Sequence, residues 1–445
     1  MIEHICSNKR CNLFVPPGLG KTVATLTALD NLSLTEDIWP VLVLAPLRVA
    51  KSVWKDEVAK WPHLRHLKVS TIVGTPDERR SALNVKADLF CINYDNLVWL
   101  IETLGDKWRF KTVVADECSK MKSMRLRQGG KRAGAFGKIA HVKVSRYLGL
   151  TGTPCANSIV DLWALCWFVD QGVRLGRSFS AFQQRWFKTG FDGFSLSPFP
   201  HSQKEIEGKI KDICLSINPA DHFPIKDPVI NKIYVDLPPA VRKKYKEMEK
   251  EFFTTIEGNS IEAANAAVKS MKLLQFSSGC LYLNDTRSEW GEVHTAKIEA
   301  LEDVVEESMG NPIMVAYNFK SDKERILKKF PKAVDMSTDK GLAAFRTGGV
   351  AVGFCHAASL GHGVDGLQNV TNTIVFFGYD WNLENHMQLI ERVGSVRQIQ
   401  AGRDRNTILH YIITKDTIDE LVLERLEQKR SVQDILLEAM KKRKA

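Results

Sequence analysis

Short apolar runs alternate with longer mixed stretches over the first 170 residues. The runs contain four to six residues each and end at turns or polar residues: 12–15, 41–45, 88–93, 112–115 and 147–151. Apolar runs of this length are typical of strands buried on both faces of a parallel sheet. The stretches between them, most clearly 22–31 and 49–61, are long enough for helical crossovers. The pattern predicts an α/β fold with a doubly wound parallel sheet.

A second set of strand-like runs follows later in the chain, at 312–316, 350–354, 372–377 and 409–413. The region of about 160–300 between the two sets has a mostly helical pattern, and no repeat with a period of 20–50 residues occurs. We therefore expect two α/β lobes with helical insertions. The expected boundaries are 1–170 for the first lobe, 171–300 for insertions and linker, 301–430 for the second lobe and 431–445 for a basic tail.

The composition of the chain is typical of a globular protein. Hydrophobic residues make up 44% of the chain and charged residues 26%, which is in the globular range, and no apolar run approaches the ~20 residues of a membrane span. We expect no membrane association and, from a start that does not resemble a secretory signal, an intracellular protein. The 62 Lys and Arg against 52 Asp and Glu give a net charge of +10, which favours a polyanionic partner. The 9 scattered cysteines contain no C-x-x-C pair and are expected to be reduced.

The first candidate site is a glycine-rich turn between a predicted strand and a predicted helix. Residues 15–22 read VPPGLGKT. Glycines let backbone N–H groups surround a phosphate, and a helix N-terminus adds positive potential. Lys21 would reach the outer phosphates and Thr22 would hold Mg²⁺; the expected contacts are Pro17, Gly18, Leu19, Gly20, Lys21 and Thr22. An ordinary glycine-rich turn is the alternative, since Val15 stands where the full motif has glycine.

Two acidic residues end the fourth predicted strand. Asp116 would hold Mg²⁺ through water, and Glu117 would orient or deprotonate an attacking water. Adjacent acids alone usually mark a solvated strand end. The four apolar residues before them and the phosphate-binding loop ~95 residues upstream favour the catalytic interpretation. The fifth predicted strand ends in LTGTP at 150–154, which is either a plain turn or a link between the nucleotide and lobe movement.

These stretches together resemble one known family. Residues 18–22, 116–122 and 150–157 are similar to motifs of the Swi/Snf-like branch of superfamily 2 helicases. Further stretches resemble the same branch: 45–48 with 54–57 and Trp61, 93–95, 361–367, 384–392 and 417–421. The similarity runs from about residue 12 to 430. The resemblance implies two RecA-like lobes, use of Mg-ATP and a compact bacterial or phage protein in the cytoplasm of the bacterial cell or infected host.

The resemblance also implies residues of the second lobe. Gly363, Asp365 and Arg392 would contact the nucleotide, and Arg392 would stabilise charge on the departing phosphate. The family has a second arginine three residues after the first, where this chain has Ser395, so Arg397 is expected to take that role. The family's adenine-recognising glutamine lies some tens of residues before the phosphate-binding loop, whereas 14 residues precede Val15. Either the native start lies further upstream or adenine is held differently, and ATP specificity is implied by the family alone.

Residues 118–160 contain no Asp or Glu and form the candidate nucleic-acid contact, here called the basic segment. Lysines and arginines would follow a phosphate backbone without reading sequence. The expected contacts are Arg48, Lys120, Lys122, Arg125, Arg127, Lys131, Arg132 and Thr151. The alternative is a mobile, solvated basic loop without a fixed partner.

The leading expectation is an ATPase stimulated by duplex or branched DNA, which translocates and remodels DNA or DNA–protein complexes. Other replication or recombination proteins are its expected protein partners. One alternative is a strand-separating helicase or RNA-dependent ATPase of the same superfamily. Another is a non-catalytic, ATP-clamped DNA-binding protein. A third, the motor subunit of a restriction or nuclease complex, would require a partner chain.

Overall fold

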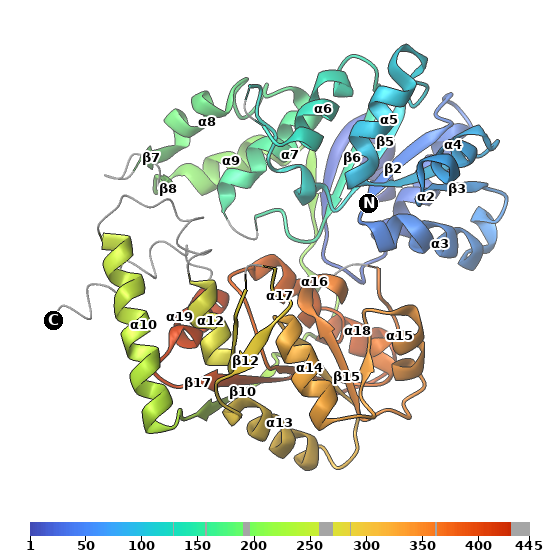
Figure 1. Cartoon of the computed structure of the whole chain (residues 1–445). Coiled ribbons are helices and arrows are strands. Elements are labelled where there is room, and N and C mark those ends of the chain that lie inside the picture. The colour runs from blue at the N-terminus through green and yellow to red at the C-terminus, as the bar shows by residue number, and fades with distance from the viewer. Residues whose placement is uncertain are drawn as a thin grey trace. The chain divides into compact units, whose positions relative to one another are not determined.

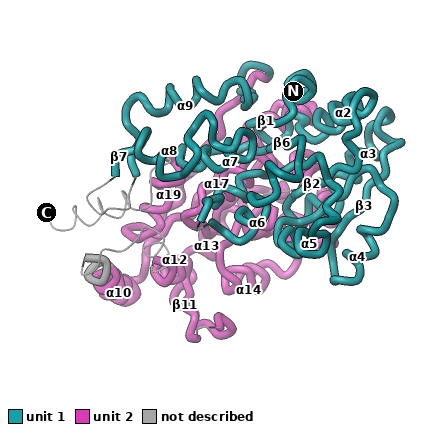
Figure 2. Tube along the Cα trace, turned by 90° about the horizontal axis from the view of Figure 1, so that it is seen from above, with its two compact units in different colours: residues 1–222 teal, residues 223–445 magenta. Residues whose placement is uncertain are grey.

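Two parallel β-sheets organise the computed structural model of the chain (Figure 1). The structure describes residues 1–127, 129–155, 158–189, 196–257, 270–284, 286–360 and 363–428. The chain divides into unit 1, residues 1–222, and unit 2, residues 223–445 (Figure 2). Each unit has its own sheet and its own core, and together they confirm two RecA-like α/β lobes with helical insertions.

The sheet of unit 1 has seven strands, all parallel, in the order β3-β4-β2-β5-β6-β1-β9. Its strands are β1 Arg10–Phe14, β2 Val41–Ala45, β3 Val69–Ile72, β4 Leu89–Asn93, β5 Thr112–Asp116, β6 Arg146–Thr151 and β9 Cys214–Ser216. The five predicted runs are confirmed as β1, β2, β4, β5 and β6. Two edge strands were not predicted, because β3 is only partly apolar and β9 has three residues.

Helices cover both faces of this sheet because alternate strand residues point to opposite sides. Leu42 and Leu44 of β2 belong to the core under α5, α6 and α7, whereas Val43 and Ala45 belong to the core under α2 and α3. The helices of unit 1 are α1 Ile2–Ser7, α2 Lys21–Ser33, α3 Trp54–Lys60, α4 Pro76–Asn84, α5 Leu97–Leu104, α6 Lys131–Ala140, α7 Leu162–Asp170, α8 Phe179–Trp186 and α9 Ser202–Ile210. A small hairpin of β7 (Phe187–Thr189) and β8 (Leu196–Pro198) follows α8.

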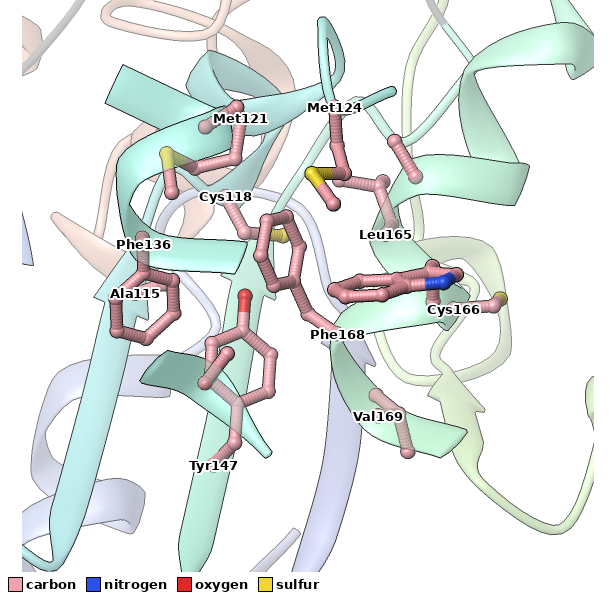
Figure 3. Close-up of a cluster of buried hydrophobic side chains, with 14 of the residues drawn as sticks. Ala115, Cys118, Met121, Met124, Phe136, Tyr147, Leu165, Cys166, Phe168 and Val169 are labelled. Carbon is pink, nitrogen blue, oxygen red and sulfur yellow. The ribbon is translucent and has the colours of Figure 1, made fainter. Parts of the chain in front are cut away.

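The predicted crossover at 49–61 is not a uniform helix. Residues Val49–Val53 form the π-helix η1, and α3 begins directly after it at Trp54. The aromatic residues Trp163, Trp167 and Phe168 are buried in α7. Figure 3 shows Phe168 in a cluster of buried side chains with Tyr147 of β6 and Phe136 of α6.

The sheet of unit 2 has six parallel strands in the order β10-β17-β16-β13-β15-β14. They are β10 Val229–Val235, β13 Ile313–Tyr317, β14 Val334–Asp335, β15 Val352–His356, β16 Thr373–Phe376 and β17 Ile408–Thr414. The four predicted runs are confirmed as β13, β15, β16 and β17. The edge strand β10 was missed because most of its residues are exposed and mixed in polarity.

Helices again pack on both faces, with α13 and α14 on one core and α10, α12, α15, α17 and α19 on the other. Their bounds are α10 Pro239–Glu257, α12 Met271–Ser278, α13 Ala296–Glu307, α14 Lys320–Lys329, α15 Asp339–Arg346, α16 Ala357–Leu360, α17 Leu383–Ile390, α18 Ser395–Gln400 and α19 Ile418–Gln428; a hairpin joins β11 (Cys280–Tyr282) to β12 (Trp290–Glu292). Among the described helices of both units, none has the length and apolar character needed to cross a bilayer. The predicted basic tail, 431–445, lies outside the described residues.

Candidate functional site

Three of the predicted motifs meet at one edge of the unit 1 sheet. Strand β6 lies between β5 and β1, and its residue Leu150 pairs with Asp116 on one side and Leu13 on the other. Neighbouring strands are ~4.8 Å apart, so the loops that follow all three strands lie side by side. The carboxyl edge of a parallel sheet is where α/β proteins bind ligands. The sheet therefore brings together the glycine-rich loop, the two acids and the 150–154 turn.

The glycine-rich loop has the backbone of a phosphate-binding loop. Gly18 and Gly20 have φ of 86° and 75°, which is the left-handed region that glycine adopts without strain. Gly20 caps α2 without a side-chain hydrogen bond, and α2 begins at Lys21. The first N–H groups of the helix can therefore serve an anion. Lys21 Nζ donates to Val15 O at 2.5 Å, which holds its ammonium over the loop.

The 150–154 turn packs directly on this loop. Val15 N donates to Thr151 O at 3.0 Å. A Cβ placed at Gly152 would lie 2.7 Å from Pro17 Cδ and 3.3 Å from Pro16 Cα, so only glycine fits without displacing the loop. A movement of either segment is therefore transmitted to the other.

Asp116 is held by two buried aromatic donors. Its side chain is 8% exposed, and its Oδ2 accepts a hydrogen bond from Trp54 Nε1 at 3.0 Å. The hydroxyl of Tyr94 donates to the backbone oxygen of Asp116 at 2.9 Å. Burial raises the pKa of Tyr94 well above its usual range, so the phenol keeps its proton and remains a donor. The sequence placed Trp54 and Tyr94 in family-like stretches but gave them no role; their spacing contains no signal of a bond to Asp116.

Glu117 has an unusual backbone conformation. Its φ of 58° and ψ of 55° are left-handed, which is uncommon for a residue with a side chain and frequent at functional sites. Thr151 Oγ1 donates to Glu117 Oε2 at 3.3 Å, and Thr153 N donates to Thr151 Oγ1 at 3.2 Å. The 150–154 turn thus orients the second acid. Burial also raises the pKa of the neighbouring Cys118 thiol, which keeps this position uncharged.

The donor set of Thr22 and Asp116 suits magnesium. Mg²⁺ prefers hard oxygen ligands and usually takes one or two from protein, with the remainder from phosphates and water. A threonine hydroxyl in the first turn of α2 and a buried carboxylate at the same sheet edge match that demand. Among the described residues, no group of three or more His, Cys, Asp or Glu is placed so that it could hold a metal ion.

The predicted residues of the second lobe also gather, within unit 2. Arg392 Nη1 donates to Val364 O at 3.0 Å, and Arg397 Nη1 forms an ion pair with Asp365. Gly363 precedes them with a φ of 68°. The structure thus links these predicted residues, which come from the loop at 363–365, from the segment that follows α17 and from helix α18.

Three residues after Arg392, where the family has its second arginine, this chain has Ser395. Ser395 begins α18, and its Oγ accepts a hydrogen bond from Lys226 N at 2.9 Å. Arg397 lies in the same first turn of α18 and is 9% exposed. Its ion pair with Asp365 holds the guanidinium beside the predicted nucleotide-contacting loop.

The basic segment is fixed to unit 1 by buried side chains. Met121, Met124 and Phe136 lie in the core under the segment (Figure 3). Three of its predicted contacts are engaged: Lys122 pairs with Asp161 at 3.4 Å, Arg132 pairs with Asp95 at 2.9 Å, and the Arg125 guanidinium stacks 3.4 Å from the Phe179 ring centre. Arg127 and Lys131 are exposed.

A groove of about 600 Å³ runs along this segment. Its described lining contains the cations Arg125, Arg127, Lys131 and Lys138, and no Asp or Glu. Gly134 of α6 faces it, and a Cβ added there would meet nothing within 4 Å. The groove therefore presents positive charge and, at Gly134, a helix position without a side chain.

The remaining predicted contacts lie nearer the acids. Arg48 is half-buried and precedes η1, and Lys120 is half-buried in the short helix η5, Cys118–Met121. Thr151 is fully buried, so a nucleic acid can reach its side chain only after unit 1 rearranges. Residues 156–157 and 361–362 of the family-like stretches lie outside the described residues.

The family model for the SNF2-related domain matches residues 1–281. The chain belongs to the SNF2-related family. This agrees with the resemblance to the Swi/Snf-like branch, and it makes the chain an SNF2-family, helicase-like ATPase motor core.

Two curated relatives of this SNF2-related chain align over nearly all of it. Protein p41 of Acyrthosiphon pisum secondary endosymbiont phage 1 is 48% identical over 100% of this chain and 97% of its own length. Nuclear protein STH1/NPS1 of Saccharomyces cerevisiae is 24% identical over 95% of this chain, which spans only 33% of that protein.

Among solved structures, the Sulfolobus solfataricus SWI2/SNF2 ATPase core in complex with dsDNA is similar to this chain. The alignment covers 97% of this chain and 90% of the Sulfolobus chain. Its sequence identity is 22% and its TM-score 0.43.

Proposed function

We propose that the chain is a DNA-dependent ATPase that binds Mg-ATP at the carboxyl edge of the unit 1 sheet and moves along duplex or branched DNA without reading its sequence. The observation that carries the proposal is the chain of contacts at this edge. The turn that packs on the phosphate-binding loop also donates, through Thr151, to the acid expected to activate water.

The distribution of charge supports a polyanionic partner. Unit 1 contains 31 Lys and Arg against 21 Asp and Glu, whereas unit 2 contains 31 of each. The whole net charge of +10 therefore belongs to unit 1, which also contains the acid-free groove. Contacts of this kind bind phosphates irrespective of base sequence.

The residues divide the work of hydrolysis. Lys21 and the first N–H groups of α2 bind the outer phosphates, and Thr22 and Asp116 would hold Mg²⁺, which neutralises charge on those phosphates when bound. Glu117 orients or deprotonates the attacking water. Arg392 and Arg397 stabilise the charge that develops on the departing phosphate. The preference for adenine follows from the family alone.

Two relatives' names favour this class of function. Helicase SWR1 of Yarrowia lipolytica is 29% identical over 39% of this chain. Helicase ssl-1 of Caenorhabditis elegans is 31% identical over 34% of this chain. The 48% identical phage relative supports a role in the cytoplasm of a phage-infected bacterium, where replication or recombination proteins would be available partners.

The test is the rate of ATP hydrolysis with no nucleic acid, single-stranded DNA, duplex DNA, forked DNA and RNA. Duplex or forked DNA is expected to stimulate hydrolysis most. Stimulation by RNA alone would replace the proposal with an RNA-dependent ATPase, and strand displacement in the same reactions would indicate a true helicase.

The use of Ser395 at the family's second arginine position favours one other candidate, the non-catalytic ATP clamp. Phosphate release that does not exceed the level of a Glu117→Gln variant, measured with DNA present, would support that clamp and overturn the proposal.

A further inference from the structure

A short stretch of chain connects a predicted DNA contact with the predicted magnesium ligand inside unit 1. Arg48 follows β2, the π-helix η1 occupies Val49–Val53, and α3 begins at Trp54. Trp54 is fully buried, and its indole N–H donates to Asp116 Oδ2 at 3.0 Å. Only six positions therefore separate Arg48 from a side chain that holds the carboxylate.

The bond from Trp54 constrains one particular oxygen of Asp116. An indole N–H can only donate, so Oδ2 is oriented by Trp54 as an acceptor. Strands β2 and β5 are neighbours with Leu44 opposite Ala115, so the indole reaches the carboxylate from the adjacent strand connection. Hydrogen bonds to a ligating group from a partner behind it set its orientation and tune metal affinity.

The π-helix gives this connection an unusual backbone. π-helices are rare, occur mostly as single turns and are frequent at functional sites. The i→i+5 bonds of η1 give a wider turn than those of α3, which continues it. Arg48 directly precedes η1, and Trp54 directly follows it. A displacement of Arg48 on binding DNA would therefore pass through the π-helix to Trp54, which holds Asp116.

We propose that Trp54 is a positioning residue for Asp116, and that η1 carries the engagement of DNA at Arg48 to this carboxylate. The inference rests on the proposed function, because it assigns the route by which DNA stimulates hydrolysis. Trp54 is fully buried and acts through its hydrogen bond to Asp116.

The first experiment isolates the indole N–H. Trp54→Phe keeps an aromatic ring but removes the donor, and Trp61→Phe is the matched control, since Trp61 Nε1 donates to Glu57 Oε2 at 2.8 Å in the same stretch of chain. The readout is binding of a fluorescent ATP analogue as Mg²⁺ is titrated, which requires no turnover. Trp54→Phe is expected to raise the Mg²⁺ needed for half-maximal binding roughly 10- to 100-fold.

The control variant is expected to titrate like the wild type. An unchanged Mg²⁺ midpoint in Trp54→Phe would overturn the positioning role. If Trp54→Phe does not fold, benzothienylalanine at position 54 replaces the N–H by sulfur at constant shape, and the same comparison applies.

The second experiment is a double-mutant cycle on stimulation, the ratio of hydrolysis rates with and without duplex DNA. If Arg48 acts through Trp54, Arg48→Ala combined with Trp54→Phe lowers this ratio no further than the more severe single variant. Losses that multiply would overturn the coupling route. A wild type that DNA fails to stimulate would end the proposed function, whereas the Mg²⁺ titration would still test the contact between Trp54 and Asp116.

Discussion

Thr151 Oγ1 donates a hydrogen bond to Glu117 Oε2 over 3.3 Å, between the ends of two neighbouring strands of unit 1. Both side chains are buried, and Glu117 already has a left-handed backbone. The direction of this carboxylate is therefore set by its own backbone and by the turn that also packs on the phosphate-binding loop.

Removing the hydroxyl at position 151 tests this relationship. Thr151→Val keeps the shape of the side chain but leaves Glu117 without this donor, and turnover is expected to fall roughly 10-fold, equivalent to about 1.4 kcal/mol, with nucleotide affinity little changed. Steady-state hydrolysis and equilibrium nucleotide binding measure the two effects. Thr112→Val, at the buried start of β5, is the control and should leave turnover intact; equal losses in both variants would point to a general packing effect.

Substitutions of Glu117 and Lys21 should separate catalysis from nucleotide binding. Glu117→Gln keeps the size of the side chain but removes the base, so hydrolysis is expected to fall roughly 10²- to 10⁴-fold while ATP still binds. Lys21→Ala should lose both binding and turnover, because the ammonium that reaches the phosphates is gone. Binding of a labelled nucleotide distinguishes the variants, and Lys86→Ala, an exposed lysine away from the site, serves as control. Hydrolysis by Glu117→Gln at the wild-type rate would contradict the assignment.

Arg397 is expected to take the role of the family's second arginine, because this chain has Ser395 at that position. Its ion pair with Asp365 keeps it beside the predicted nucleotide loop of unit 2. Arg397→Ala is expected to reduce DNA-stimulated turnover by on the order of 10³-fold, as loss of a charge-stabilising arginine does, with nucleotide binding retained. Arg403→Ala, which removes an exposed arginine, is the matched control and should leave turnover unchanged. Turnover like that of the wild type would show that Arg397 has no part in hydrolysis.

Salt dependence tests the basic segment. Arg125 stacks on Phe179 and is best left unchanged, so the informative variant replaces the exposed Arg127 and Lys131 by alanine. The DNA concentration for half-maximal stimulation should rise, and the slope of log affinity against log salt should flatten by roughly 0.9 for each lost phosphate contact. A double variant at the exposed Lys86 and Lys204 should change neither. An unaltered slope in the first variant would exclude these two residues from the contact.

Two buried histidines predict an acid sensitivity of unit 2. Burial lowers the pKa of His386 to about 3 and that of His294 to about 4. In the unfolded chain both imidazoles have the ordinary pKa of ~6.5, so below that pH the unfolded state binds more protons and the free energy of unfolding decreases as pH falls. The expected loss between pH 7 and pH 5 is about 2 kcal/mol for each histidine.

Urea unfolding at the two pH values measures this loss. His386→Asn, which cannot titrate, should show a smaller difference between pH 7 and pH 5 than the wild type. The exposed His201→Asn should show the wild-type difference. A His386→Asn variant as sensitive to acid as the wild type would refute the prediction.

The central strands of both sheets could be predicted from sequence because a strand buried on two faces needs a continuous apolar run. The edge strands β3, β9, β10 and β14 could not, since exposure or brevity removes that signal. The motifs at the unit 1 edge were identified because phosphate and magnesium chemistry demands particular residue types directly after strands.

Contacts between residues distant in sequence were beyond such reasoning. Trp54 and Asp116 lie 62 positions apart, and only the pairing of β2 with β5 brings them together. Likewise, nothing in the pattern of residues 49–61 distinguishes a π-helix from an α-helix. The stacking of Arg125 on Phe179 also depends on how α8 packs, so the sequence alone did not distinguish Arg125 from the other expected nucleic-acid contacts.

The unequal net charge of the two units affects how DNA binding would depend on salt concentration. Because the whole excess of Lys and Arg lies in residues 1–222, ionic strength is expected to act mainly on the contacts of unit 1 with DNA. Added salt would weaken the binding of DNA by unit 1 more than any binding by unit 2, whose charges balance. Dissociation from DNA as salt rises would therefore begin at the contacts of unit 1.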